Sequence, residues 1–307
     1  MITIFALEGI GEVRAGADLA ELIITAAGSQ LRDGDIVVVT SKIISKTQGR
    51  TAPAPNRGQV IEDETVRTVA RRGDTAIVRD RRGLILAAAG VDNSNVTPDQ
   101  ILLLPPDPDA AAADLRAELR RRTGLDLGVV VSDTAGRPWR VGQTDQAIGA
   151  AGVPVLWDYR GGHDGYGNEL RVTETAIADE LAAAADLVKG KVDGRPVAVV
   201  RGLVRSPSNP AAAQPADLAA RLQRPASQDW FTFGSQEAVL AALLKATGQP
   251  DRYEALVRLP AGERAGTLLA GATLDDGASD LVRALLAVDL AAVSSDLEDT
   301  RPLSDPG

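Results

Sequence analysis

Short apolar runs rich in β-branched residues alternate along this chain with longer Ala- and Leu-rich segments, and this alternation limits the folds open to it. The short runs have the length of buried strands, and the longer segments repeat apolar residues at helical spacing. A helix that Asp109 is expected to cap ends before Gly124. The pattern predicts an α/β fold, or a mixed α+β fold, without internal repeats. We expect strands at residues 36–40, 75–79, 84–89, 127–131 and 197–200, and helices at 19–31, 62–72, 109–122 and 175–188.

The composition changes at about residue 205. The segment SPSNPAAAQPAD is rich in Pro, Ser and Ala and is typical of a linker. Beyond it the pattern is mostly helical, with helices expected at 236–247 and 279–292. We therefore expect one main domain over residues 1–228 and a short, mostly helical extension over residues 229–307.

The composition also excludes several classes of protein. The chain has 33 Lys and Arg against 42 Asp and Glu, a net charge of −9, which argues against a nucleic-acid partner. It has no cysteine, which excludes disulfides and thiolate metal sites and is compatible with a reducing cytosol. We find no signal-peptide pattern and no apolar run near the roughly 20 residues of a membrane span, and expect a cytoplasmic protein without a membrane partner. With His163 as the single histidine, any divalent metal must be held by oxygen ligands.

Polar side chains follow three of the apolar runs directly. Ser41, Lys42 and Lys46 follow the first, Asp92 to Asn95 follow the second, and Ser132 to Thr134 follow the third. In open α/β sheets, ligands bind outside the carboxyl ends of the strands. Oxygen ligands from Asp92, Asp133 and Thr134 would suit a hard cation such as Mg²⁺ or Mn²⁺.

Each of these segments also has an ordinary structural explanation. Asp92 in GVDNSN could form an Asx-turn, Asp133 could serve a turn or a helix cap, and Lys42 and Lys46 could be a solvated face. The glycine-rich residues 161–168 are as compatible with a surface turn as with a ligand-binding loop, and His163 within them receives no catalytic role. No Walker A motif is present, and residues 9–14, GIGEVR, match a dinucleotide motif only weakly.

Several strings, in order along the chain, resemble one known family. IVVVTSKIISKTQGR, GVDNSNV and SDTAGRPWRVGQTDQAIGAAGV are the most specific, and the similarity runs from about Ile4 to Gly202, roughly two thirds of the chain. They resemble the coenzyme F420-0:L-glutamate ligases (CofE, and the amino-terminal ligase domain of FbiB). The resemblance implies a two-subdomain ligase fold of mixed sheets flanked by helices, without a P-loop or Rossmann motif. It also implies amide ligation: GTP phosphorylates the terminal carboxylate of F420-0, and the amine of L-glutamate attacks the acyl phosphate. Further glutamates then join by γ-glutamyl links.

Position by position, the resemblance also assigns residues. It implies metal ligation by Asp92, Asp133 and Thr134, and catalytic roles for Asp92, Asp133 and Lys46. From chemistry alone we add Arg137 and Arg140 as bidentate partners for a substrate carboxylate or phosphate. The implied cofactors are GTP as cosubstrate and two Mn²⁺ or Mg²⁺ ions, with K⁺ as a further candidate; the implied partners are F420-0, L-glutamate and a second copy of the chain. The residues matched to GTP contacts are Ile10, Gly11, Glu12, Val13, Ser41, Lys46, Asn95, Lys189, Gly190, Lys191, Val192, Asp193, Gly194, Arg195 and Pro196.

The chain departs from the family pattern at two places. Lys191 stands where archaeal members carry a Gln that contributes to the second metal; a protonated amine cannot ligate a cation, so the number of metals stays open. Residues 229–234, DWFTFG, resemble the junction into a flavin domain, but the chain from this junction to residue 307 is too short for one, and we expect no FMN. Two alternatives also stay open: a nucleotide-dependent ligase for another acceptor, and a non-catalytic deazaflavin-binding protein.

Overall fold

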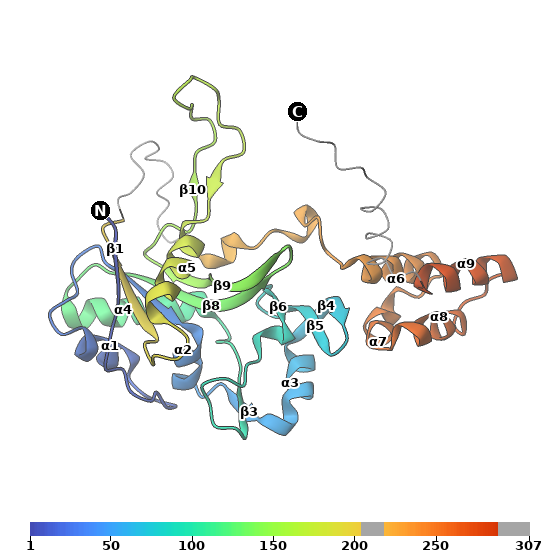
Figure 1. The fold of residues 1–307 in the computed structure, drawn as a ribbon, viewed down its shortest axis with the longest axis horizontal. Coiled ribbons are helices and arrows are strands. Elements are labelled where there is room, and N and C mark those ends of the chain that lie inside the picture. The colour runs from blue at the N-terminus through green and yellow to red at the C-terminus, as the bar shows by residue number, and fades with distance from the viewer. Residues whose placement is uncertain (204–217, 288–307) are drawn as a thin grey trace, which may run out of the picture. The chain divides into compact units, whose positions relative to one another are not determined.

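The computed structural model describes residues 1–203 and 218–287, which fold as two compact units. Unit 1 comprises residues 1–64 and 82–224, and unit 2 comprises residues 65–81 and the chain from residue 225 (Figure 1). The predicted linker after residue 205 lies mostly outside the described residues, as does the end of the helix expected at 279–292. No helix within the described ranges is long and apolar enough to cross a membrane.

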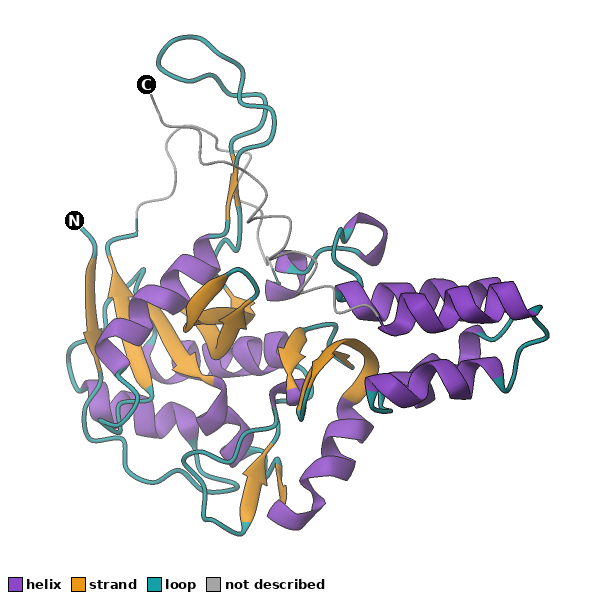
Figure 2. Ribbon diagram, turned by 45° about the vertical axis from the view of Figure 1, so that its right-hand side comes forward, coloured by secondary structure: helices purple, strands orange, loops and turns teal. Residues whose placement is uncertain are grey.

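A five-stranded sheet forms the centre of unit 1, and Figure 2 shows its strands in orange with purple helices beside them. The strand order is β1-β12-β2-β8-β9. Strands β2 and β8 run parallel, and the other neighbours are antiparallel. The sheet is therefore mixed, and the predicted mixed α/β class is confirmed. Its strands are β1 (Thr3–Ala6), β12 (Val197–Arg201), β2 (Ile36–Thr40), β8 (Gly128–Arg137) and β9 (Arg140–Ala151).

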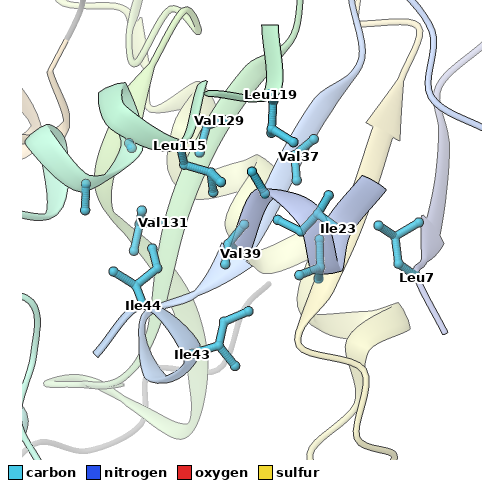
Figure 3. Close-up of a cluster of buried hydrophobic side chains, with 14 of the residues drawn as sticks. Leu7, Ile23, Val37, Val39, Ile43, Ile44, Leu115, Leu119, Val129 and Val131 are labelled. Atoms are coloured by element: carbon cyan, nitrogen blue, oxygen red, sulfur yellow. The ribbon is translucent and has the colours of Figure 1, made fainter. Parts of the chain in front are cut away.

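Alternating side chains of the central strands are buried on opposite faces of this sheet. On one face, Val37, Val39 and Val129 pack with α1 (Leu19–Ala27) and α4 (Pro108–Thr123) (Figure 3). On the other face, their neighbours pack against α5 (Ile177–Lys189). Burial on both faces explains why the strands are continuous apolar runs. The second face contains Ile36, Val38, Val130, Ala198 and Val200.

Shorter elements complete unit 1. Strand β2 passes directly into a helix, and β3 pairs antiparallel with β7. Two short strands, β10 and β11, form the base of a projecting arm that contains the glycine-rich residues 161–168 (Figure 1). These elements are α2 (Ser41–Thr47), β3 (Thr51–Pro53), η1 (Ala54–Asn56), α3 (Arg57–Glu64), β6 (Ile85–Ala87), η2 (Ala88–Gly90), β7 (Gln100–Leu102), β10 (Trp157–Asp158), β11 (Glu174–Thr175) and η4 (Ala219–Leu222).

Unit 2 joins the hairpin of residues 65–81 to helices from the carboxyl-terminal part of the chain. The buried Glu237 carboxylate accepts the Arg71 backbone N–H at 3.0 Å, and Glu254 accepts the Thr68 backbone N–H at 2.9 Å. Leucines of the helices, among them Leu240 and Leu268, form its core. The elements are β4 (Thr65–Arg72), β5 (Thr75–Asp80), η5 (Ala226–Gln228), α6 (Ser235–Ala246), η6 (Pro250–Arg252), α7 (Tyr253–Val257), α8 (Ala261–Leu269) and α9 (Asp276–Ala287).

The helix expected at 62–72 is wrong. Helix α3 ends at Glu64, and Thr65–Arg72 is strand β4, paired antiparallel with β5. The segment TVRTVARR contains four β-branched residues, and Gly73 with φ +55° allows the tight turn back to β5. Pairing with β5 and contacts to the helices of unit 2 therefore prevail over the polar helical pattern.

Three smaller expectations also need correction. The N-cap of α4 is Asp107, whose carboxylate accepts the Ala110 N–H at 2.9 Å, and not Asp109. Helix α1 ends at Ala27 rather than at residue 31. Strand β8 continues to Arg137, so Asp133 lies within a strand rather than after its end.

Candidate active site

The carboxyl end of β2 lies beside the middle of β8. These strands are parallel neighbours with Thr40 opposite Ser132, so the next residues, Ser41 and Asp133, are also adjacent. The Ser41 hydroxyl donates to Asp133 Oδ1 at 2.7 Å. Two of the three predicted polar segments therefore meet at this point.

The third segment arrives on the loop between η2 and β7. Asp92 forms an isolated bridge with Leu102: its N–H donates to the Leu102 carbonyl at 3.0 Å. The Asp92 carboxylate pairs with Lys42 Nζ at 2.6 Å and accepts the Ser94 N–H at 2.8 Å. Burial alone would raise the pKa of this carboxyl, but Lys42 and Ser94 outweigh it and hold the pKa below its usual value. Asp92 thus forms the Asx-turn and faces Lys42 at the same time.

Asp133 is the carboxyl in this group whose buried negative charge is not fully stabilised by its neighbours. Burial raises its pKa to about 6; Ser41 and Lys42 oppose the shift, and the charges of Asp145 and Asp92 add to it. Among the described residues, Ser41 alone donates a hydrogen bond to it. A bound cation would relieve the cost of this buried charge.

These residues fit one hard divalent cation. Asp92 and Asp133 offer oxygen ligands, and an ion bound between them would have to displace the Lys42 ammonium, which pairs with Asp92 at 2.6 Å. In the part of the chain that the structure describes, no three acidic or histidine side chains gather closely enough to hold a metal. The protein would therefore supply two carboxylates and leave the other positions to water and phosphate, as is usual for Mg²⁺.

Asp145 on β9 is a central residue that the sequence prediction missed. It lies opposite Thr134 across the β8–β9 pair and is only 3% exposed. Its Oδ2 accepts Ser132 Oγ and Lys189 Nζ, both at 2.8 Å, and its Oδ1 accepts Thr134 Oγ1 at 2.7 Å and Lys191 Nζ at 3.3 Å. Burial raises the pKa of Asp145, but Lys189 and the hydroxyl donors outweigh it and lower the pKa. The motif GQTD was the available signal, but the strand register that brings it to Thr134 is not readable from sequence.

A cavity of about 410 Å³ in unit 1 brings together most of the residues assigned to GTP. The loop after β1, the start of α2 and the loop before β12 form its walls, and Lys46 Nζ pairs there with Glu12 at 2.6 Å. Thr134, Asp145 and Lys42 line it as well. Of the fifteen assigned residues, Ser41 lies instead against Asp133, and Asp193 pairs with Arg195. The GTP assignments themselves stay predictions.

Arg137 and Arg140 do not lie among the residues that line this cavity. They face each other at the end of the β8–β9 pair, and Arg137 donates to the Val141 carbonyl at 2.7 Å. Their proposed contact with substrate stays a prediction. His163 lies in the projecting arm, where its backbone bridges to Glu169.

A second cavity, of about 480 Å³, lies within unit 2 between Arg67, Phe233 and Tyr253. None of the described residues that line it belongs to the predicted site. We therefore place the candidate active site in unit 1.

Comparison with known proteins identifies relatives across this region. A family model described as F420-0:gamma-glutamyl ligase matches residues 9–56 and 53–202, which include every residue of the candidate site. The coenzyme F420:L-glutamate ligase of Methanopyrus kandleri is 42% identical over 212 residues, which cover 62% of this chain and 83% of that protein. The enzyme of that name from Methanothermobacter thermautotrophicus is 38% identical over 224 residues, 66% of this chain and 89% of its own. The enzyme of that name from Haloarcula marismortui is 41% identical over 223 residues, which cover 64% of this chain and 86% of that protein.

Proposed function

The chain belongs to the F420-0:γ-glutamyl ligase family, and from this premise we propose that it is a GTP-dependent coenzyme F420:L-glutamate ligase of F420 biosynthesis. The observation that carries the proposal is the match over residues 9–202 together with the cavity in which residues of the matched segments meet. The conclusion that it is an acid–amino-acid ligase comes from the family. GTP as the nucleotide and the acyl-phosphate route are the finer parts of the proposal.

The reaction has two balanced steps. The terminal carboxylate of F420-0 attacks the γ-phosphorus of GTP, which gives an acyl phosphate and GDP. The amine of L-glutamate then attacks the acyl carbon, loses a proton and releases inorganic phosphate, which leaves an amide. Further glutamates would join through their γ-carboxylates in the same way.

The side chains of the cavity suit phosphoryl transfer, which depends on positioning and charge neutralisation more than on protein nucleophiles. Lys42 and Lys46, both on α2, bring two ammonium groups to the cavity wall. Lys46 is paired with the exposed Glu12, and a phosphate oxygen could take the place of that carboxylate. Glycines 190 and 194, both at positive φ, let the loop before β12 approach a ligand with its backbone.

Asp92 and Asp133 do not line the cavity themselves, but Asp92 pairs with Lys42, which does. A divalent cation held by these two carboxylates, Mn²⁺ or Mg²⁺, would add positive charge at the edge of the cavity. Burial raises the pKa of Asp133, and a bound cation would stabilise its charged form, which supports this placement. We also infer a cytoplasmic homodimer from the family resemblance and the cysteine-free composition.

The test is a reconstituted reaction of the purified full chain with F420-0, L-glutamate, GTP and Mn²⁺ or Mg²⁺. We expect addition of glutamyl residues by mass spectrometry, with one GDP formed for each. Lys46→Gln should raise the KM for GTP at least tenfold, whereas Lys245→Gln, a matched change in unit 2, should leave it unchanged. Intact GTP and unmodified F420-0 would contradict the proposal.

Two comparisons separate the alternatives. Faster turnover with ATP, or with an amino acid other than glutamate, would indicate a related ligase with another substrate. GTP binding that does not depend on a divalent cation, without turnover, would indicate a non-catalytic deazaflavin-binding protein.

A further inference from the structure

Lys191 holds a position in the candidate site that a cation would otherwise occupy. Its ammonium lies 2.7 Å from Asp186 Oδ1, 2.9 Å from Thr134 Oγ1 and 3.3 Å from Asp145 Oδ1. These three acceptors match the three N–H donors of an ammonium group. The side chain is 56% exposed and lines the cavity, so the charge faces the space available to a ligand.

Two of the three acceptors around Lys191, Asp145 and Thr134, are already engaged by other groups. Each oxygen of Asp145 already accepts two hydrogen bonds, one from a hydroxyl and one from a lysine ammonium. A carboxylate offers about four acceptor positions, so Asp145 is saturated. The Thr134 hydroxyl donates to Asp145 and accepts from Lys191, so its hydrogen and one of its two lone pairs are in use.

The two ends of the site therefore differ in how much positive charge already lies beside their carboxylates. At one end, the described residues give Asp133 a single hydrogen bond, from Ser41, and one ammonium, that of Lys42, pairs with Asp92. At the other end, Asp145 and Asp186 face the ammonium groups of Lys189 and Lys191, and Lys189 is only 4% exposed. A second divalent cation at Thr134 would have to displace Lys191 and would lie beside another buried ammonium. The residues present do not fit it.

We propose that the ammonium of Lys191 takes the place of a second divalent cation at Thr134 and Asp145, and that the site binds one divalent cation per chain, at Asp92 and Asp133. The proposal rests on the proposed function and refines its cofactor requirement. Lys191 then acts as a resident positive charge for the phosphates of the nucleotide. Asp145 and Asp186 act as positioning residues, because they hold the ammonium on the wall of the cavity.

The test counts bound Mn²⁺ in the full chain by electron paramagnetic resonance of the free ion, with a non-hydrolysable GTP analogue present. We expect one Mn²⁺ per chain for the unaltered protein, with the spectrum of an isolated ion. Lys191→Gln removes the ammonium and supplies an amide oxygen, so we expect a second Mn²⁺ and a spectrum of two coupled ions. Lys191→Met removes the charge without supplying a ligand, and should keep one Mn²⁺ while weakening binding of the analogue at least tenfold.

Lys245→Gln in unit 2 is the matched control and should keep one Mn²⁺. Two Mn²⁺ per chain in the unaltered protein, with ligation intact, would overturn this inference and leave the proposed function standing. A count of one in Lys191→Gln would overturn the replacement by Lys191 as well. Binding of neither Mn²⁺ nor the analogue would overturn the proposed function and this inference with it.

Discussion

Asp133 and Asp145 are carboxylates on neighbouring strands. The surroundings of Asp133 destabilise its negative charge, and those of Asp145 stabilise it. Burial raises the pKa of Asp133 to about 6, whereas Lys189 and hydroxyl donors lower the pKa of Asp145 in spite of its burial. The first charge is costly to the folded protein without a cation, and the second holds buried groups together. Two neighbouring carboxyl groups with pKa values moved apart are typical of a functional site.

Exchange of each carboxylate for an amide should reveal this difference in the metal-free protein. In Asp133→Asn, we expect the free energy of unfolding at pH 7 to rise by about 1–3 kcal/mol, because the buried carboxylate is removed. The folded pKa of about 6 lies above the unfolded value near 4, so the ionisation cost is present above pH 6 and disappears as the pH falls towards 4. The gain should therefore shrink between pH 7 and pH 4. Guanidinium unfolding in EDTA measures it.

Asp145→Asn is the matched control. It leaves the ammonium of Lys189 buried without its carboxylate, so we expect a loss of about 3–5 kcal/mol. Equal losses in both variants would contradict the assignment of Asp133 as an uncompensated charge. Asp133→Asn should also lose affinity for Mn²⁺, so its gain in stability would come at the expense of the site.

Sequence reasoning could predict part of this site because polar residues follow strands that are neighbours in the sheet. Ser41 and Asp133 meet because β2 and β8 run parallel, a pairing typical of alternating strands and helices. Asp145 could not be found in this way. Its place depends on the β8–β9 register, which shifts between Val131 and Ser132, and no local pattern encodes such a shift.

At the scale of elements, two aspartates at the start of α4 have different tasks. Asp107 caps the helix by accepting the Ala110 N–H at 2.9 Å. Asp109, two residues later, accepts the N–H groups of Ala150 and Ala219 at 2.8 Å and of Ala220 at 3.1 Å. It therefore ties the helix to β9 and to η4, within unit 1.

We expect Asp109→Ala to cost more stability than Asp107→Ala. Loss of the cap should lower the free energy of unfolding by about 1 kcal/mol. Loss of Asp109 leaves three backbone donors without their acceptor and should cost about 2–4 kcal/mol. Chemical denaturation of the two variants and of the unaltered protein provides the comparison. A larger loss in Asp107→Ala would contradict the role of Asp109 as the tie between α4, β9 and η4.

Helices α4 and α5 were predictable, since both bury one face against the sheet and are followed by the capping glycines 124 and 190. The segment 65–72 was not, because its local pattern is ambiguous. Thr65 and Thr68 have strand propensity while the arginines suit an exposed helix, and the partner strand decides. Helix α3 ends where that pairing begins.

At the scale of the whole molecule, the compact units do not follow the linear order of the chain. A change of composition at about residue 205 predicts a linker, but nothing in the sequence indicates that the hairpin at 65–81 belongs with the carboxyl-terminal helices. That membership depends on distant contacts, such as the Tyr253 hydroxyl donating to the Thr68 carbonyl at 2.9 Å. Unit 1 nevertheless contains both the sheet and every residue that lines the candidate active site.

This division predicts that two truncations will behave differently. Removal of residues 225–307 alone should produce a protein that aggregates, because Thr68 and Arg71 of the hairpin lose their hydrogen-bond partners Glu237, Glu254 and Tyr253. In a second variant, residues 65–81 are also replaced by a short Gly-Ser linker. Thr65 pairs with Asp80 across β4 and β5, so the two ends to be joined are close together. We expect this variant to be monodisperse in size-exclusion chromatography and to bind GTP with Mn²⁺ as the full chain does, since the cavity is built within unit 1. If the first variant were as monodisperse as the second, the hairpin would not depend on the carboxyl-terminal helices, and its assignment to unit 2 would be wrong.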